Sequence, residues 1–276
     1  MTIFLVVAAC LTLAGMVAMY LGLSASDRQV LFTPKRHFQG RTYSLALPKS
    51  RNAQTKIILG LDGFGGNGKR FSYYTSLHNV DRNAVVIYPD PSRPRKKGER
   101  PGWNACFCCG SGWVSEVDDV GFLLGLVEKI RNELQLSNAP LFAAGFSNGA
   151  FMVQRLAAEH PAAITAVVSV AGTIGTEKKH LMLNGPVPIL LVHGTKDRVV
   201  PFEGGAGSDP DFKWLSHEST KEIWERNNGQ RAEVRPLVLP GAGHVWFDWR
   251  LVNFWHKKPS VSVNAIAFFN EQTNQS

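Results

Sequence analysis

The sequence predicts an α/β fold in which helices cover both faces of a mostly parallel central sheet. Short apolar runs that are typical of buried strands alternate along the chain with longer runs of helical period. This alternation favours one parallel sheet, because each helix carries the chain back across a face of it. The 276 residues, 44% of them hydrophobic, are enough for one such domain with a core of its own.

The predicted strands are five to seven residues long and most end at glycine, proline or another turn-forming residue. In the longest predicted helix, apolar residues recur at helical spacing from Val120 to Leu134. Ser115 with Asp118 predicts a capping box, with Asp118 as a cap and Asp119 as its exposed neighbour. The predicted strands are Arg41–Leu47, Lys56–Leu61, Ala84–Tyr88, Pro140–Ala144, Ile164–Val170, Pro188–Gly194 and Val234–Leu239. The predicted helices are Val117–Leu134, Ala150–His160, Glu218–Asn227 and Val263–Glu271.

Ahead of these elements lies an uncharged, mostly apolar segment, Ile3 to Leu23. It is long enough to cross a bilayer as a helix, and it is also compatible with a signal peptide cleaved after Ser24-Ala25-Ser26. We predict a signal peptide or membrane anchor over residues 1–26 and the catalytic domain over residues 37–272. The positive charges of Arg28, Lys35 and Arg36 favour a cytoplasmic domain by the positive-inside rule, whereas the cysteines favour export.

The motif Gly145-Phe146-Ser147-Asn148-Gly149 joins a predicted strand to a predicted helix. A serine on such a turn has its hydroxyl raised clear of the sheet, and this is the arrangement of a nucleophile elbow. Asp197 and His244 each follow the end of another predicted strand. The order Ser147, Asp197, His244 therefore predicts a triad, in which His244 takes the serine proton and Asp197 orients and stabilises the imidazole.

The glycine-rich turn after Leu61 is a second element of the predicted site. Acyl transfer needs backbone N–H groups aimed at the developing oxyanion. We expect these donors to be the amides of Asn148, after the nucleophile, and Phe64, with Gly63 as the alternative. The turn lacks the Gly-Lys-Ser/Thr ending of a phosphate-binding loop.

The net charge is +8, and much of it lies in the proline-bounded run Arg93 to Pro101. This run indicates an exposed loop, which is either a solvated face or attracted to an anionic surface such as phospholipid or acidic polysaccharide. No nucleic-acid-binding motif accompanies the charge. Cys106, Cys108 and Cys109 lack a fourth metal ligand at suitable spacing, so we expect no metal and one disulfide of undetermined pairing.

With these residues in place, the chain resembles the polyhydroxybutyrate depolymerase and feruloyl esterase family of α/β-hydrolases from about Arg41 to Phe269. The resemblance implies a secreted or periplasmic serine esterase without a cofactor, acting on hydroxyalkanoate oligomers or on aromatic acids esterified to plant sugars. The resemblance implies that the catalytic triad of the family corresponds to Ser147, Asp197 and His244. The matching motifs are Leu61–Asn67, Trp103–Ala105, Cys108–Gly110, Val117–Phe122, Gly145–Gly149, His193–Asp197 and Gly243–Trp246.

The chain departs from the family at Asp62, where the family usually has histidine, and at Gln230, near which many relatives carry a cysteine. We expect Trp246 and Trp103 to line the substrate pocket, and His193 to be structural. Trp246, Phe247, Trp249, Phe254 and Trp255 form either an aromatic wall beside the site or core packing.

We therefore expect a serine carboxylesterase with an ester substrate, polymeric substrates included. Two alternatives remain: a peptidase or thioesterase with the same triad, and a membrane-tethered binding module without activity. Retention of Ser147, Asp197 and His244 speaks against the second alternative.

Overall fold

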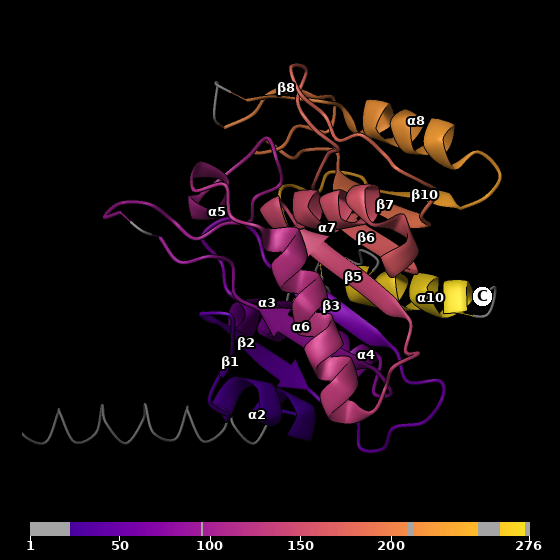
Figure 1. Ribbon diagram of the computed structural model, residues 1–276. Helices are drawn as coiled ribbons and strands as arrows, with labels where there is room; N and C mark the ends of the chain where they lie inside the picture. The colour runs from indigo at the N-terminus through magenta and orange to yellow at the C-terminus, as the bar shows by residue number, and fades with distance from the viewer. Residues whose placement is uncertain (1–22, 95, 209–211, 248–259, 274–276) are drawn as a thin grey trace, which may run out of the picture.

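The computed structural model describes residues 23–94, 96–208, 212–247 and 260–273. Its centre is an eight-stranded sheet in the order β1-β2-β4-β3-β5-β6-β7-β10, parallel throughout except for β1 and β2 (Figure 1). The strands of this sheet are β1 (Arg36–Phe38), β2 (Arg41–Ala46), β3 (Ile57–Leu61), β4 (Val85–Pro89), β5 (Leu141–Phe146), β6 (Ala166–Val170), β7 (Ile189–Gly194) and β10 (Val234–Leu239). A separate two-stranded ribbon joins β8 (Gly205–Ala206) and β9 (Lys213–Trp214).

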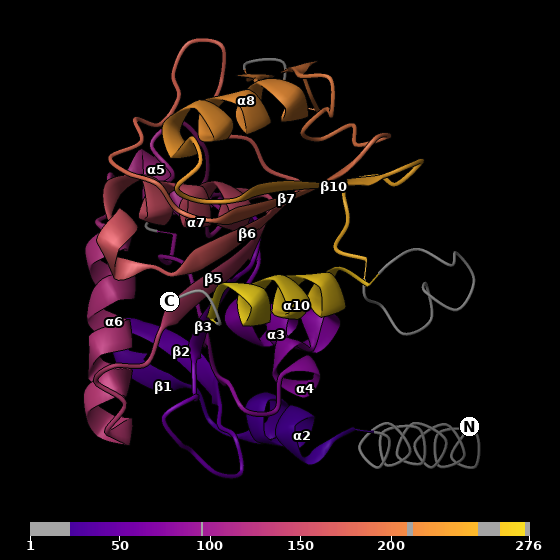
Figure 2. The same cartoon turned by 90° about the vertical axis from the view of Figure 1, so that its right-hand side faces the viewer.

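Helices cover both faces of the sheet, as predicted (Figure 2). Apolar side chains of α6, α7 and α8 pack on one face, and those of α2, α3, α4 and α10 pack on the other. Strands β3 to β7 are therefore buried on both sides, which explains their nearly continuous apolar runs, whereas β10 at the edge of the sheet is only partly buried. The helices are α2 (Ala25–Phe32), α3 (Gly68–Thr75), α4 (Leu77–Val80), α5 (Ser111–Val114), α6 (Asp119–Leu134), α7 (Asn148–Glu159), the 3-10 turn η1 (Pro161–Ala163), α8 (His217–Asn228) and α10 (Val261–Thr273).

The start of α6 corrects one prediction about side-chain placement. Asp118 is the N-cap, and its carboxylate accepts from the Gly121 amide, so the predicted capping box from Ser115 is wrong. Asp119 is fully buried rather than exposed. Its carboxylate pairs with Arg41 and accepts the Asn104 amide at 2.6 Å, so it joins β2 and the loop before α5 to the helix.

The packed domain also begins earlier than the predicted residue 37. Ser24 caps α2, and Ser24 and Asp27 form a reciprocal capping box. The buried Asp27 carboxylate accepts from Asn79 at 2.7 Å and contacts His78 at 3.2 Å, which ties α2 to α4. Residues 1–22 lie outside the described part of the chain, and no helix within that part is long and apolar enough to span a bilayer.

Candidate active site

The predicted site residues follow four strands of the same sheet. Asp62 follows β3, Ser147 follows β5, Asp197 follows β7 and His244 follows β10. These strands run parallel, with β3 beside β5 and β7 beside β10, and only β6 stands between the two pairs. Their carboxyl ends therefore meet at one edge, where ligand sites of open α/β sheets lie.

Ser147 occupies a sharp turn between β5 and α7. Its φ of 54° and ψ of −120° are rare for a residue with a side chain, and such conformations cluster at active sites. The flanking glycines make the turn possible, because a Cβ on Gly145 would lie 2.1 Å from the Gly149 carbonyl oxygen. A Cβ on Gly149 would lie 2.1 Å from the Leu61 carbonyl oxygen. The geometry is that of a nucleophile elbow.

Asp197 and His244 form a hydrogen-bonded pair. His244 Nδ1 lies 2.7 Å from Asp197 Oδ2, and the other carboxylate oxygen accepts the amides of Val199 and Val200. Burial by itself would raise the pKa of Asp197, but hydrogen bonds from His193 and His244 outweigh it and hold the pKa well below its ordinary value. The carboxylate is thus charged and fixed, as an orienting partner for an imidazole must be.

The structure brings Ser147 beside this pair without joining it to the base. Phe146, the residue before the serine, packs against the His244 ring with centroids 4.9 Å apart. No hydrogen bond joins Ser147 to His244 within the described residues. In enzymes without bound substrate such contacts are often long and tighten when the complex forms.

Two backbone amides next to Ser147 are available as oxyanion donors. The Phe64 amide donates to no acceptor within the described ranges, and the Asn148 amide lies in the first turn of α7, where helical N–H groups have no partner inside the helix. The Gly63 amide donates to Asp62 Oδ1 at 2.8 Å, so the alternative donor is engaged. The Phe64 and Asn148 amides therefore have no acceptor among the described residues, and their role as oxyanion donors stays a prediction.

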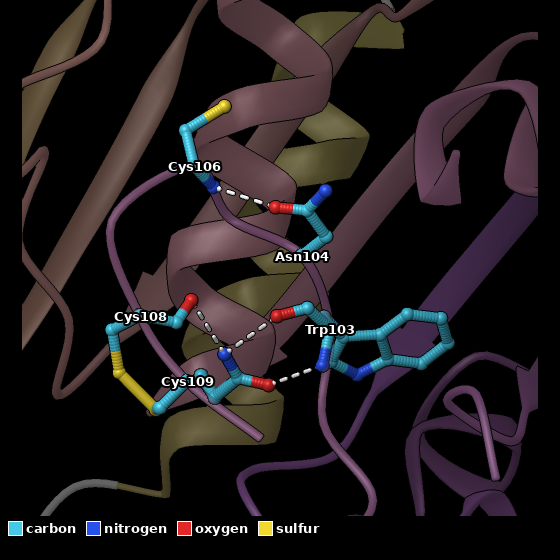
Figure 3. Close-up of a disulfide and its surroundings, with 6 residues drawn as sticks. Trp103, Asn104, Cys106, Cys108 and Cys109 are labelled. Atoms are coloured by element: carbon cyan, nitrogen blue, oxygen red, sulfur yellow. Dashed lines mark hydrogen bonds between the residues drawn. A yellow bond between two sulfur atoms is a disulfide. The ribbon is translucent and has the colours of Figure 1, made fainter. Parts of the chain in front are cut away.

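The side chain of Asn148 fixes the loop that surrounds it. Its Oδ1 accepts the Trp103 amide at 2.6 Å, and its Nδ2 donates to the carbonyls of Trp103 and Cys108. Among the cysteines that the structure describes, Cys108 and Cys109 form a disulfide and Cys106 is a free thiol (Figure 3). In Figure 3 the Cys106 thiol points away from the disulfide.

Asp62 points into a closed network rather than toward the oxyanion site. It has no exposed surface, and its carboxylate accepts from the amides of Gly63 and Asn67 and from Arg70 Nε at 2.9 Å. The Tyr74 hydroxyl donates to the same carboxylate. Burial and the Asp62 charge raise the pKa of Tyr74, so the phenol remains a donor. The carboxylate thereby fixes the turn that carries the Phe64 amide.

The two tryptophans predicted to line the pocket are buried instead. Trp103 has no exposed surface, and its indole N–H donates to the Asp62 carbonyl. Trp246 is 6% exposed, packs edge-on against Phe71 and donates to Ser262 Oγ, so its assignment to the pocket is corrected to core packing. Phe247 is also buried, whereas Asp248, Trp249, Phe254 and Trp255 lie outside the described residues.

His193 contributes more to the site than its prediction as a structural residue implied. Its Nε2 lies 2.8 Å from the Val200 carbonyl and 3.4 Å from Asp197 Oδ2, so it supports the loop that holds the acid. Its ring also packs edge-on against the ring of the buried His217. The sequence did not indicate His217, because the two histidines lie on separate elements, β7 and α8. Within the described ranges, no group of three or more His, Cys, Asp or Glu side chains could hold a metal ion.

Known esterases are similar to this chain in sequence. Residues 125–228 match the phospholipase/carboxylesterase family model. The chain is 29% identical over 209 residues to NocK of Nocardia uniformis subsp. tsuyamanensis, which is named as an esterase, covering 71% of this chain and 58% of NocK. It is 28% identical over 208 residues to feruloyl esterase C of Emericella nidulans, covering 71% of this chain and 69% of that protein.

Solved structures show the same fold at low sequence identity. A carboxylesterase from Bacillus cereus superposes with a TM-score of 0.58 at 16% identity and covers 85% of this chain and 95% of its own. TT1662 from Thermus thermophilus superposes with a TM-score of 0.60 at 17% identity, covering 87% and 98%. The chain is thus similar in sequence to named esterases, and it shares the α/β-hydrolase fold of the solved carboxylesterase.

Proposed function

We propose that the chain is an exported serine carboxylesterase acting on hydroxyalkanoate-type esters or on feruloyl and other aryl esters. The observation that carries this proposal is the strained Ser147 turn at the same sheet edge as the Asp197–His244 pair. Feruloyl esterase C of Emericella nidulans supports the aryl alternative.

The proposed reaction proceeds through an acyl-enzyme. Ser147 Oγ attacks the ester carbonyl carbon while His244 Nε2 accepts its proton, and the amides of Phe64 and Asn148 stabilise the oxyanion. The C–O bond to the alcohol breaks, and the alcohol leaves with the proton from His244. Water then attacks the acyl group on Ser147 with His244 as base, releasing the acid and restoring the serine.

Rates with methyl ferulate and with 3-hydroxybutyrate oligomers distinguish the two ester classes, and a matched amide and thioester test the peptidase and thioesterase alternatives. Turnover of either ester above the amide and the thioester supports the proposal. Turnover of the amide or the thioester alone contradicts it. Ser147→Ala serves as the background in each assay.

The proposal of export rests on the Cys108–Cys109 disulfide, since disulfides persist in oxidising compartments. A cut before Asp27 would pass through the first turn of α2 and remove Ser24, whose hydroxyl accepts the Asp27 amide and whose own amide donates to the Asp27 carboxylate. This supports a retained anchor over a cleaved signal. A C-terminal reporter that is active only in an oxidising compartment tests export, and a reporter active only in the cytoplasm would refute it.

A further inference from the structure

Arg100, in the loop between β4 and α5, packs against the turn that carries the Phe64 amide. Its guanidinium carbon stands 4.8 Å from the centre of the Phe64 ring, and Phe64 is 38% exposed. The position depends on Gly65, because a Cβ there would lie 2.3 Å from an Arg100 terminal nitrogen. Gly65 also adopts a φ of 74°, which disfavours other residues.

The segment that presents Arg100 is fixed at its base. The Gly65 amide donates to the Pro101 carbonyl at 2.7 Å, and the Ser111 amide donates to the Arg100 carbonyl at 3.0 Å. A bridge between Ser92 and Gly102 closes the loop that projects at the left of Figure 1, between β4 and α5. The arginine backbone is therefore held against the oxyanion turn.

The guanidinium has no carboxylate partner within the described ranges. The buried carboxylate of this turn, Asp62, already accepts from Arg70, Tyr74 and two backbone amides. Arg100 is exposed, and Arg93, Lys96 and Lys97 add positive charge to the same loop. A planar cation with free N–H donors binds carboxylates preferentially, often through two parallel hydrogen bonds.

Arg100 and Ser147 both lie against the glycine-rich turn that follows β3. A Cβ on Gly63 would lie 3.1 Å from Ser147 Cβ, and Gly65 is two residues further along. Two residues span at most about 7 Å, so the guanidinium lies within about 15 Å of the nucleophile. This upper limit includes the separation of about 5 Å between the ester carbon and the terminal carboxylate of a 3-hydroxybutyrate dimer.

We propose that Arg100 is a specificity-determining residue that binds a free carboxylate of the substrate. The substrate class is then a carboxylic ester bearing a second, ionised acid group, such as the acid end of a short hydroxyalkanoate oligomer. This inference rests on the proposed esterase function and narrows its substrate.

The test compares the 3-hydroxybutyrate dimer as its free acid with the same dimer whose terminal carboxyl is a primary amide. The two molecules share one ester bond and differ by one negative charge. Wild type is expected to have the higher kcat/KM on the acid, and salt should reduce the difference by screening. Arg100→Gln is expected to lower the acid-to-amide ratio about fivefold, the upper range for an exposed ion pair.

Two controls separate this inference from the proposed function. Arg93→Gln removes an exposed charge from the same loop and should leave the acid-to-amide ratio of kcat/KM unchanged. Arg100→Lys keeps the positive charge and should therefore retain part of the wild-type preference for the acid. An equal loss on both dimers, or an unchanged ratio, in Arg100→Gln would overturn the inference. Failure of wild type to hydrolyse 4-nitrophenyl butyrate would instead overturn the esterase function itself.

Discussion

Replacing Asp62 with alanine tests whether this carboxylate supports the oxyanion turn. The substitution leaves three partly or fully buried donors without an acceptor: the amides of Gly63 and Asn67 and the Tyr74 hydroxyl. At about 1 kcal/mol each, the expected loss in the free energy of unfolding is about 3 kcal/mol. The exposed Arg70 side chain becomes solvated when Asp62 is removed. Loss of its ion pair therefore adds little to the loss in the free energy of unfolding.

Activity should fall as well, because a displaced Phe64 amide no longer meets the oxyanion. Loss of one such donor costs about 100-fold in kcat. Asp62→Asn keeps one acceptor oxygen and the side-chain shape, so we expect a smaller effect on both quantities. Arg70→Gln is the matched control for loss of the ion pair alone.

Urea unfolding and hydrolysis of 4-nitrophenyl butyrate measure the two effects. A carboxylate that faced the oxyanion would repel it, and its removal would then raise the rate. Faster hydrolysis by Asp62→Ala, or a loss of stability below about 1 kcal/mol, would refute the network as described.

Three further predictions concern other parts of the site. Asp197→Asn should lower kcat about 10,000-fold with the fold intact, because the imidazole loses its orienting charge, and near-normal rates would point to another acid. Burial and the electrostatic effect of nearby His193 lower the pKa of His217 to about 4, so the unfolded chain binds a proton from pH 6.5 downward that the folded chain does not. Stability should therefore fall by about 1.4 kcal/mol per pH unit between pH 6.5 and 4, and His217→Phe should remove this slope in acid urea titrations. Gly149→Ala should prevent folding as judged by circular dichroism, since its Cβ would strike the Leu61 carbonyl, whereas Gly125→Ala, with its nearest contact at 3.4 Å, should fold.

The parallel strands of the core, and the polar residues that follow them, could be predicted from the sequence because both produce recognisable patterns within a few residues. Buried strands such as Ile57–Leu61 and Ile189–Gly194 are apolar throughout, and the turns after them carry recognisable glycines. The α2 helix was missed because its residues have only a weak amphipathic pattern, ASDRQVLF.

Side-chain environment was harder to predict, because it depends on contacts between distant segments. Asp119 reads as a surface residue at a helix start, yet Arg41, 78 positions away, reaches it from β2. Trp246 lies two residues after the proposed base, but its ring turns into the core formed with Phe71 of α3. Spacing along one segment does not reveal either partner.

Reaction with a fluorophosphonate, followed by peptide mass spectrometry, tests the central claim most directly. This reagent forms a stable ester with an activated serine and leaves ordinary surface serines unmodified. We predict one adduct, on the peptide that contains Ser147, and neither an adduct nor ester hydrolysis in Ser147→Ala. An adduct on another serine, or more than a tenth of wild-type hydrolysis in Ser147→Ala, would contradict the account.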